Sequence, residues 1–448
     1  MKSILPTLRY VALTCVVVSL FSCEKDDSSS PNPENPEFGS VEYIKTFGGS
    51  GLDEAVSVVM ANDGNYVLLG TTESTDGDID GKTTTDSDYW VLKVSQEGTI
   101  LWNKVYGGSS DDKATSIKKT NDGGFIVSGY SRSDDGDVSE NGGFHDYWIV
   151  KLDGSGNLQW EKSFGYPGSD QALNVLQTSD GGYFTTGFLD VTASNGEGND
   201  TRGTLHGVGE YWGIRMDANG TKIWRNYFGG TNNDRSYDAI QTADGGFLMA
   251  GASESTDFDI TDDKGSYDYW LVKVNANGEK QWTRSYGGSE IDVCYAIANA
   301  EGGYIMVGDA RSSDQDVTNA KGNADLWAVK VNTTGDIVWK RNLGGEQFDS
   351  ARSITPMGNG EYLLSGTTRS TTGDVSGNNG QNDLWTLIID EQGVIQYEAT
   401  FGGSSFDFGD AAIPVEDNKI IVVGNTESND IDIPQFRGVK DVLLIKIK

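Results

Sequence analysis

Cysteine and histidine are scarce in this chain. Three of its 448 residues are cysteine and two are histidine. Cys15 and Cys23 fall in the N-terminal segment, and Cys294 stands alone in the rest of the sequence, so no intramolecular disulfide can form there. The histidines show no zinc-ligand spacing and no paired nucleophile, and no phosphate-binding loop is present. The sequence therefore names no catalytic residue, and stability must come from packing of the 11 Trp, 19 Tyr and 16 Phe.

Positive charge is scarce as well. Lysine and arginine number 34 against 67 aspartates and glutamates, which gives a net charge of −33. A surface of this sign repels the phosphates of nucleic acids and of anionic lipid head groups. We therefore expect no nucleic-acid partner, and a polyanionic ligand is disfavoured unless cations bridge it.

Long apolar runs are absent except near the N-terminus. One run extends from Tyr10 to Phe21 behind two basic residues, and it is too short to cross a bilayer. We interpret residues 1–22 as a removable export signal. Residues 23–40 are rich in Ser, Pro, Asn and Glu and cannot bury an apolar face, so they are expected to form a flexible tether. The globular part then comprises residues 41–448.

The segment Leu20-Phe21-Ser22-Cys23 resembles the lipobox of bacterial lipoproteins. The resemblance implies that Cys23 is lipidated and becomes the new N-terminus; an ordinary secretory signal cut near Ser22 is the alternative. The next residues, Glu24-Lys25-Asp26-Asp27, resemble the acidic tag of lipoproteins that the Bacteroidota send to the outside of the outer membrane. This resemblance implies an outer-membrane lipoprotein at the cell surface, which contacts the membrane through its lipid anchor only.

One motif recurs seven times in residues 41–448. A glycine, usually the first of a Gly-Gly pair, is followed five residues later by aspartate, at intervals of 57 to 64 residues. A period of this length indicates one supersecondary unit copied in series. The seven motif aspartates are Asp53, Asp112, Asp170, Asp234, Asp292, Asp349 and Asp407.

Each repeat is predicted to form four short strands. In the copy that starts at Asp268, β-forming runs at 268–274, 280–286, 293–298 and 304–308 are separated by turns that contain Gly or Asn. Helical periodicity is absent, and a β-solenoid has a much shorter period. The sequence therefore predicts an all-β fold, a seven-bladed β-propeller of four-stranded blades.

The two ends of the repeat region complement each other. The last copy stops at 441–448 without the fourth strand that follows elsewhere and usually bears Trp, and the region begins with the missing strand at 41–49. We therefore expect the N-terminal strand to complete the last blade at its outer edge, which removes an open seam. The strand after each motif aspartate is then innermost. The residue two positions beyond the aspartate is always small, as a crowded axis requires: Ala55, Ala114, Ala172, Ser236, Cys294, Ala351 or Gly409.

Tryptophan recurs at two positions of the repeat. Such regular recurrence favours packing layers between blades, and a stacking platform for sugars is the alternative for any ring that proves exposed. The first position holds Trp90, Trp148, Trp212, Trp270, Trp327 and Trp385, and the second holds Trp102, Trp160, Trp224, Trp282 and Trp339.

Most of the long loops between the second and third strands carry an Asp-x-Asp pair. In the first copy, Asp76, Asp78 and Asp80 precede Gly81, and alternating carboxylates suit calcium. The twelfth position holds Ser87 in place of glutamate, and short aspartates also bond backbone groups in turns. Calcium binding and purely structural turns are therefore both open. The motif aspartates leave a similar choice, between a ring that collects cations and caps on free backbone donors.

The third copy departs from the pattern, and symmetry breaks are where a repeat ring often carries function. Its long loop, 191–209, lacks the paired aspartates and contains Arg202 and His206. The other histidine, His145, lies in the matching loop of the second copy. We therefore take His145, Arg202 and His206 as candidate binding residues, with solvated loop residues as the alternative.

The recurring segments Phe/Tyr-Gly-Gly, Asp-Gly-Gly-Phe/Tyr, Asp-Tyr-Trp-x-x-Lys and Trp-x-Lys make residues 41–448 similar to the uncharacterised β-propeller repeat lipoproteins of the Bacteroidota type. The resemblance implies an envelope propeller and supplies no catalytic residues. We expect a monomeric, non-enzymatic binding or scaffold protein. The face that carries the long loops between second and third strands is expected to contact a glycan or another envelope protein. The alternative is a carbohydrate-active enzyme on the same face, a glycoside hydrolase or lyase, because propellers host such sites and a carboxylate pair suffices for hydrolysis.

Overall fold

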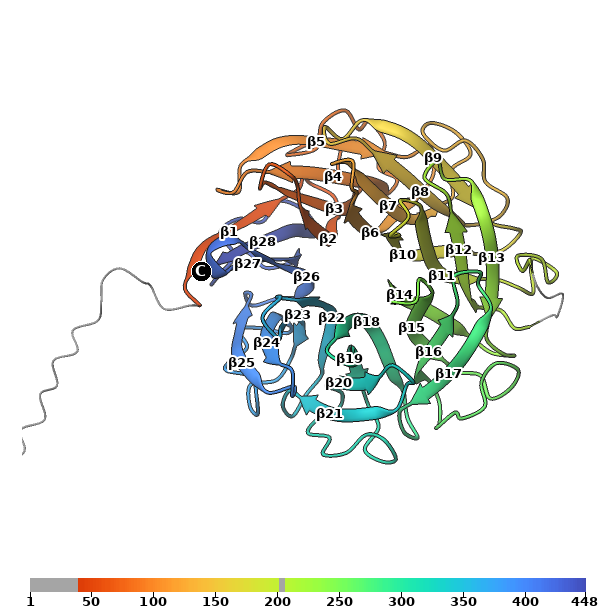
Figure 1. Ribbon diagram of the computed structural model, residues 1–448. Coiled ribbons are helices and arrows are strands. Elements are labelled where there is room, and N and C mark those ends of the chain that lie inside the picture. The colour runs from red at the N-terminus through yellow and green to blue at the C-terminus, as the bar shows by residue number, and fades with distance from the viewer. Residues whose placement is uncertain (1–38, 201–205) are drawn as a thin grey trace, which may run out of the picture. The chain divides into compact units, whose positions relative to one another are not determined.

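The computed structural model describes residues 39–200 and 206–448, which form seven four-stranded antiparallel sheets arranged around a central axis (Figure 1). The predicted all-β, seven-bladed propeller is therefore confirmed. Residues 1–38 lie outside the described residues, and they include Cys23, the expected signal and most of the tether. Arg202 lies outside them as well. The helical content of the described part is one 3-10 turn, Glu416–Asn418, and no helix there is long and apolar enough to cross a membrane.

The blades follow one another in chain order. Blade 1 contains β2 (Asp53–Met60), β3 (Tyr66–Thr72), β4 (Asp88–Val94) and β5 (Ile100–Tyr106), and blade 2 contains β6 (Asp112–Lys119), β7 (Phe125–Ser131), β8 (Asp146–Leu152) and β9 (Leu158–Phe164). Blade 3 contains β10 (Gln171–Gln177), β11 (Tyr183–Leu189), β12 (Glu210–Met216) and β13 (Lys222–Phe228), and blade 4 contains β14 (Asp234–Gln241), β15 (Phe247–Ser253), β16 (Asp268–Val274) and β17 (Lys280–Tyr286). Blade 5 contains β18 (Asp292–Ala300), β19 (Gly303–Ala310), β20 (Asp325–Asn332) and β21 (Ile337–Leu343), and blade 6 contains β22 (Asp349–Pro356), β23 (Glu361–Thr368), β24 (Asp383–Asp390) and β25 (Ile395–Phe401). Blade 7 contains β26 (Asp407–Val415), β27 (Lys419–Thr426), β28 (Asp441–Ile447) and β1 (Val41–Phe47).

Burial explains why the strands differ in composition. The third strand of a blade, such as β16 with the sequence DYWLVKV, is buried along its whole length because neighbouring blades cover both of its faces. The fourth strand, such as β17 with KQWTRSY, forms the outer edge of the blade and keeps exposed polar residues at its start. Asp-Gly-Gly turns join the first two strands of blades 2 to 4, and the left-handed backbone of Gly245 (φ +80°) shows why glycine is needed there.

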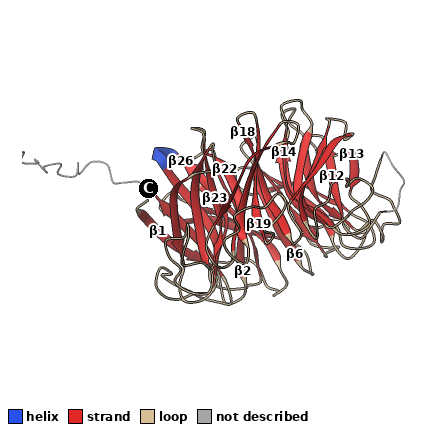
Figure 2. Ribbon diagram, turned by 90° about the horizontal axis from the view of Figure 1, so that it is seen from below, coloured by secondary structure: helices blue, strands red, loops and turns tan. Residues whose placement is uncertain are grey.

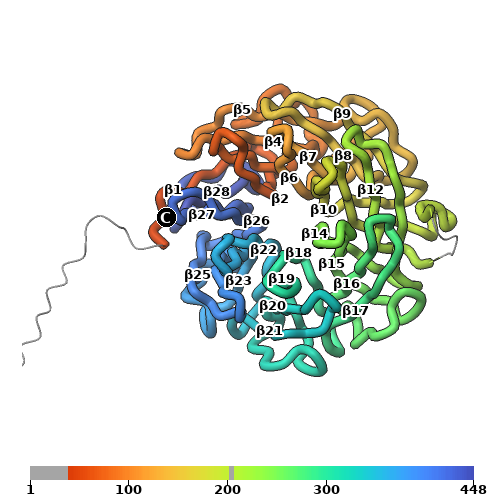
Figure 3. The backbone as a smooth tube through the Cα atoms, viewed as in Figure 1, coloured from red at the N-terminus to blue at the C-terminus, as the bar shows by residue number. Residues whose placement is uncertain are grey.

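The N-terminal strand closes the ring as expected. β1 lies at the outer edge of blade 7 and pairs antiparallel with β28, from Val41 opposite Ile447 to Phe47 opposite Val442 (Figure 3). The amide of Ser40 also donates to the carbonyl of Lys448. The last blade is therefore built from both ends of the described chain, and its outer edge is not left unpaired.

The first strand of each blade is innermost, and each of these strands contains a β-bulge. β2, β6, β10, β14, β18, β22 and β26 surround the axis (Figure 1). The small residue two positions after each motif aspartate is buried, which confirms that prediction. The register shifts at the next position in every blade, so this residue is displaced from the regular pairing. The displaced residues are Val56, Thr115, Leu173, Tyr237, Tyr295, Arg352 and Asp410.

Tryptophans fill the spaces between blades. The six at the first repeat position are 0 or 1% exposed. A tyrosine of the preceding blade contacts four of them and donates its hydroxyl to the tryptophan carbonyl, as Tyr211 does to Trp270 over 2.9 Å. The tryptophans at the second position are more accessible, and each packs against a turn glycine of the next blade, as Trp102 does against Gly156. Both sets are packing layers, as predicted.

Replacing Trp270 by alanine is expected to lower the free energy of unfolding by about 3 to 5 kcal/mol, because its ring is fully buried between blades 3 and 4. Urea unfolding followed by circular dichroism measures the loss. Trp102→Ala is the control: its half-buried ring removes less apolar contact, so its loss should be clearly smaller. Equal losses in the two variants would contradict this account of the packing.

Candidate functional site

The motif aspartates hold the connections between blades. In all seven copies, one carboxylate oxygen accepts a hydrogen bond of 2.7 or 2.8 Å from the backbone amide that follows the first motif glycine. In every copy except the third, serine or threonine hydroxyls of the second strand and the following loop bond the same carboxylate; Thr72 and Ser74 contact Asp53 in this way. The aspartates are 0% exposed. They are therefore caps on backbone donors, which was the structural alternative, and not an accessible ring.

The Asp-x-Asp loops are fastened to the same connections. The first aspartate of five pairs accepts a hydrogen bond of 2.7 to 2.9 Å from a connection amide, as Asp76 does from Ser50. The second aspartate of each of these pairs accepts a hydrogen bond from the amide of the first motif glycine, as Asp78 does from Gly48 over 3.1 Å. Connections and long loops thus share one face of the ring, here called the long-loop face (Figure 2).

The candidate calcium residues have protein partners. Besides the bonds of Asp76 and Asp78, the Asp80 carboxylate accepts a hydrogen bond of 3.1 Å from the Asn103 side chain. Residues 39–200 and 206–448 contain no group of three or more His, Cys, Asp or Glu side chains placed to hold a metal ion. Calcium binding at Asp76, Asp78 and Asp80 stays a prediction.

His145 sits where blade 2 meets the connection to blade 3. Its Nδ1 lies 2.9 Å from the Ser169 hydroxyl, and its ring has edge contacts with Tyr130 and Phe144. Burial lowers the pKa of His145 to about 4, and the positive charge of Arg132 acts in the same direction. The imidazole is therefore neutral at pH 7.

His206 lies in the loop between β11 and β12 of blade 3, four residues before Glu210. It is 9% exposed, its Nδ1 lies 3.1 Å from the Glu210 carboxylate, and its ring stacks on Phe258. Burial raises the pKa of Glu210, and the nearby Asp234 raises it further. The two histidines thus contact different side chains, and Arg202, the third candidate, lies outside the described residues. Their role in binding stays a prediction.

The displaced bulge residues line a central channel that the sequence analysis missed. A cavity of about 340 Å³ is bounded by all seven inner strands and includes these seven residues. They do not repeat: blades 1 to 3 contribute Val56, Thr115 and Leu173, whereas blades 4 to 7 contribute two tyrosines, an arginine and an aspartate. The channel wall is therefore asymmetric, with its aromatic and charged groups on consecutive blades.

The aromatic and charged groups of the channel form a contiguous row. The Tyr237 and Tyr295 rings are 5.1 Å apart, and the Arg352 guanidinium lies 3.8 Å from the centre of the Tyr295 ring. Loss of water contact in the channel lowers the pKa of Arg352. The neighbouring Tyr295, Asp309 and Asp410 outweigh this effect and raise it. Burial also raises the pKa of Asp410 to about 7, against the effect of Arg352. This half of the channel therefore holds an arginine beside a carboxyl group that is partly protonated at neutral pH.

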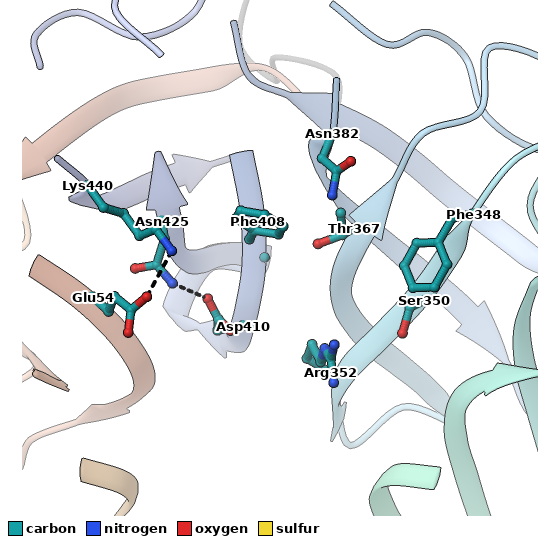
Figure 4. Close-up of a pocket in the computed structure, with 11 residues that line it drawn as sticks. Glu54, Phe348, Ser350, Arg352, Thr367, Asn382, Phe408, Asp410, Asn425 and Lys440 are labelled. Atoms are coloured by element: carbon teal, nitrogen blue, oxygen red, sulfur yellow. Dashed lines mark hydrogen bonds and ion pairs between the residues drawn. The ribbon is translucent and has the colours of Figure 1, made fainter. Parts of the chain in front are cut away.

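A second cavity opens where blades 6, 7 and 1 meet, and we call it the mouth pocket (Figure 4). Its volume is about 340 Å³, within the range of small-molecule sites. Its lining lies at the strand ends next to the long-loop face, since Asn382 and Lys440 immediately precede third strands. The lining consists of Glu54, Phe348, Ser350, Arg352, Thr367, Asn382, Phe408, Gly409, Asp410, Asn425 and Lys440.

Several polar groups of the mouth pocket are fixed by one another. Lys440 donates to Glu54 over 2.8 Å, and its ammonium lies 5.5 Å from the Phe408 ring centre. Asn425 donates to Asp410 over 2.6 Å and also bonds the backbone of Ala55, which links blade 7 to blade 1 (Figure 4). Arg352 and Asp410 line both this pocket and the channel, so they separate the two cavities.

The sequence did hold a signal for these cavities. Across the seven repeats, the residue three positions after the motif aspartate varies among valine, threonine, leucine, tyrosine, arginine and aspartate, while the residues immediately before and after it stay small or short. A position that varies within a conserved-looking frame of internal repeats indicates a lining that is free to differ between blades. The paired carboxylates attracted attention instead, because they recur.

The fold and its cavities define the class of protein, a seven-bladed β-propeller with a polar channel. No protein-family model matches the chain, and no curated protein matches it. Among solved structures, the WD40 domain of Pan2 from Neurospora crassa is similar over 92% of this chain and 97% of its own, with a TM-score of 0.50 and 8% identity. Sqt1 from Chaetomium thermophilum is similar over 89% of this chain and 99% of its own, with a TM-score of 0.45 and 9% identity. At such identities, the likeness to the Pan2 domain concerns the fold alone.

Proposed function

We propose that this propeller is a non-enzymatic binding or scaffold protein of the cell envelope, which presents its long-loop face to a glycan or an envelope protein. The observation that carries the proposal is the bonding of the recurring carboxylates to the backbone. Because they cap the connections and fasten the long loops, the face is a preorganised surface, which lowers the entropy cost of binding.

The envelope address rests on the sequence. The lipobox-like segment ending at Cys23 and the acidic residues after it support a lipid-anchored protein on the outside of the outer membrane, of the Bacteroidota type. The net charge of −33 supports a partner that is neutral or positively charged. Calcium in the Asp-x-Asp loops belongs to the same proposal as a further stabiliser of this face.

A carbohydrate-active enzyme is the second candidate, and one observation favours it. Asp410 and Glu54 line the same pocket, and a carboxyl group with a pKa of about 7 can serve as a general acid. Both groups are engaged, however, Glu54 with Lys440 and Asp410 with Asn425. This engagement suits a fixed binding pocket better than a pair of reacting groups.

Incubating the full chain with a panel of insoluble polysaccharides, and separately with solubilised envelope proteins, separates these functions. The binding function predicts retention of the protein on a polysaccharide, or capture of a defined envelope protein, without release of soluble sugar. Release of reducing ends or unsaturated sugars, abolished in Asp410→Asn, would identify the enzyme instead. Failure to retain any glycan or envelope protein contradicts the proposal.

A further inference from the structure

The mouth pocket contains a carboxamide whose buried oxygen has no hydrogen-bond partner among the described residues. Asn382 is 8% exposed, and within the described part of the chain its Oδ1 makes no hydrogen bond. Leaving a buried polar atom unpaired is unfavourable. Asn382 lines the pocket across from Asp410 and Asn425 (Figure 4). The oxygen is itself buried, whereas the amide nitrogen of Asn382 faces the pocket (Figure 4) and can donate to a hydroxyl or carbonyl oxygen of a ligand.

The rest of the lining combines apolar rings with hydrogen-bonding groups. Phe348 and Phe408 are half-buried and provide apolar surface from blades 6 and 7. Arg352 brings several N–H donors to the inner end of the pocket, while its guanidinium is positioned by stacking on Tyr295. Aromatic surface beside amide and guanidinium groups matches a sugar ring, which has apolar C–H faces and a rim of hydroxyls.

The charges of the pocket balance, which argues for a neutral ligand. The two cations, Arg352 and Lys440, face two carboxyl groups, Glu54 and Asp410, and Lys440 and Glu54 already form an ion pair. Among the described residues, Arg352 is the one cation of the pocket that forms no ion pair, and the protein as a whole carries a net charge of −33. The negative charge of the protein would repel an anionic sugar outside the pocket. Inside the pocket such a sugar would find no cation other than Arg352 that is free to pair with it.

We propose that the mouth pocket binds the terminal unit of a neutral saccharide, with Asn382 as the residue that reads its hydroxyl or acetamido groups. The inference rests on the proposed binding function and gives it a location at the channel mouth, between blades 6, 7 and 1. Arg352 and Asp410 close the inner end, so the sugar enters endwise from the long-loop face, and the remainder of the glycan stays outside.

Titration calorimetry of the full chain with glucose, galactose, N-acetylglucosamine and glucuronic acid, and with short neutral oligosaccharides, tests this assignment. At least one neutral sugar should bind. Asn382→Leu keeps the volume of the side chain and removes its polar atoms without breaking an internal hydrogen bond, so binding should weaken roughly tenfold or more while the melting temperature is preserved. Arg352→Gln should weaken the same sugar.

The matched control is Tyr267→Ala, which changes the same repeat position in blade 4, outside the pocket. Its affinity should equal that of the unmodified protein. Neutral-sugar binding that is unchanged in Asn382→Leu overturns the pocket assignment and leaves the general binding function standing. Binding of glucuronic acid alone, lost in Arg352→Gln, overturns the neutral assignment. If no sugar binds while an envelope protein is captured, the inference fails and the scaffold function survives.

Discussion

A chain that begins at Ser50, and therefore lacks β1, is expected to lose more than about 4 kcal/mol of its free energy of unfolding and to associate in solution. Phe47, which is 5% exposed, would alone cost about 3 to 5 kcal/mol if truncated. The deletion also leaves β28 as an unpaired outer edge, and all seven of its residues are buried in the intact ring. Exposed apolar edges pair with other chains. Guanidinium unfolding and light scattering measure the two effects.

The control for this deletion is a chain that begins at Gly39. It retains β1 and the backbone bonds of Gly39 and Ser40 to Lys448, so its unfolding midpoint should match that of the longer chain. A synthetic peptide of residues 39–49 added to the chain that begins at Ser50 should restore stability and the monomer, because it can add back the missing strand. A shortened chain that is monomeric and as stable as the control contradicts closure by β1.

The ring and its closure could be predicted because they follow from repetition. Seven motif aspartates count the blades, and residues 41–49 match the fourth strand that the last repeat does not supply itself. Capping by Asp53 and its counterparts was also within reach as an alternative, since an aspartate close behind a Gly-Gly break commonly accepts backbone hydrogen bonds. These features depend on short sequence motifs, and each motif recurs in several repeats of the same chain.

The channel could not be predicted in the same way, because the bulge reverses the alternation of side chains within each inner strand. Strict alternation from Asp53 and Ala55 makes position 57 buried, whereas the structure buries Val58 and displaces Val56 toward the axis. Which residues face the channel therefore depends on one extra residue that leaves no mark in the hydrophobic pattern.

The mouth pocket was further out of reach, since its walls come from three blades. Glu54 belongs to β2, while its partner Lys440 is 386 residues away. Asn382 shows no special signal in the sequence; its importance arises only because the folded ring places its carboxamide in the wall of the pocket. The irregular third repeat attracted the candidate residues His145, Arg202 and His206 because its departure spans a whole loop, whereas the variation among the inner strands is confined to one position in each repeat.

The free energy of unfolding is expected to be several kcal/mol higher at pH 5 than at pH 8. Burial raises the pKa of Asp170 to about 8 and the pKa values of Asp234 and Asp268 to about 7, and all three are at most 1% exposed. In the unfolded chain these groups titrate near 3.9, so the folded state binds more protons between about pH 4 and pH 8. The stabilisation is complete below the unfolded pKa and is lost as the pH rises through the folded values.

Groups with lowered pKa values do not reverse this trend. They affect stability below about pH 4, or they are fewer than the buried carboxyl groups. Lysine contacts and hydrogen bonds hold the pKa values of Asp122 and Asp244 at about 2, against the effect of burial, so the stability they contribute is lost only below about pH 4. His145, with a pKa of about 4, opposes the trend between about pH 4 and pH 6.5, but it is one group against many buried carboxyls. Stability should therefore fall from pH 5 to pH 8 overall.

Urea unfolding at constant ionic strength from pH 5 to pH 8 measures the trend, and Asp170→Asn tests its origin. The variant cannot ionise at this position, so its stability should change less with pH than that of the unmodified protein, whatever its absolute stability. Asp134→Asn removes an exposed carboxylate of the blade 2 loop and should leave the slope unchanged. A stability that is flat or rising across this range, or a slope in Asp170→Asn equal to that of the parent, would show that the buried carboxyls are ionised in the folded ring. Their capping bonds to the backbone amides would then compensate fully for the loss of water.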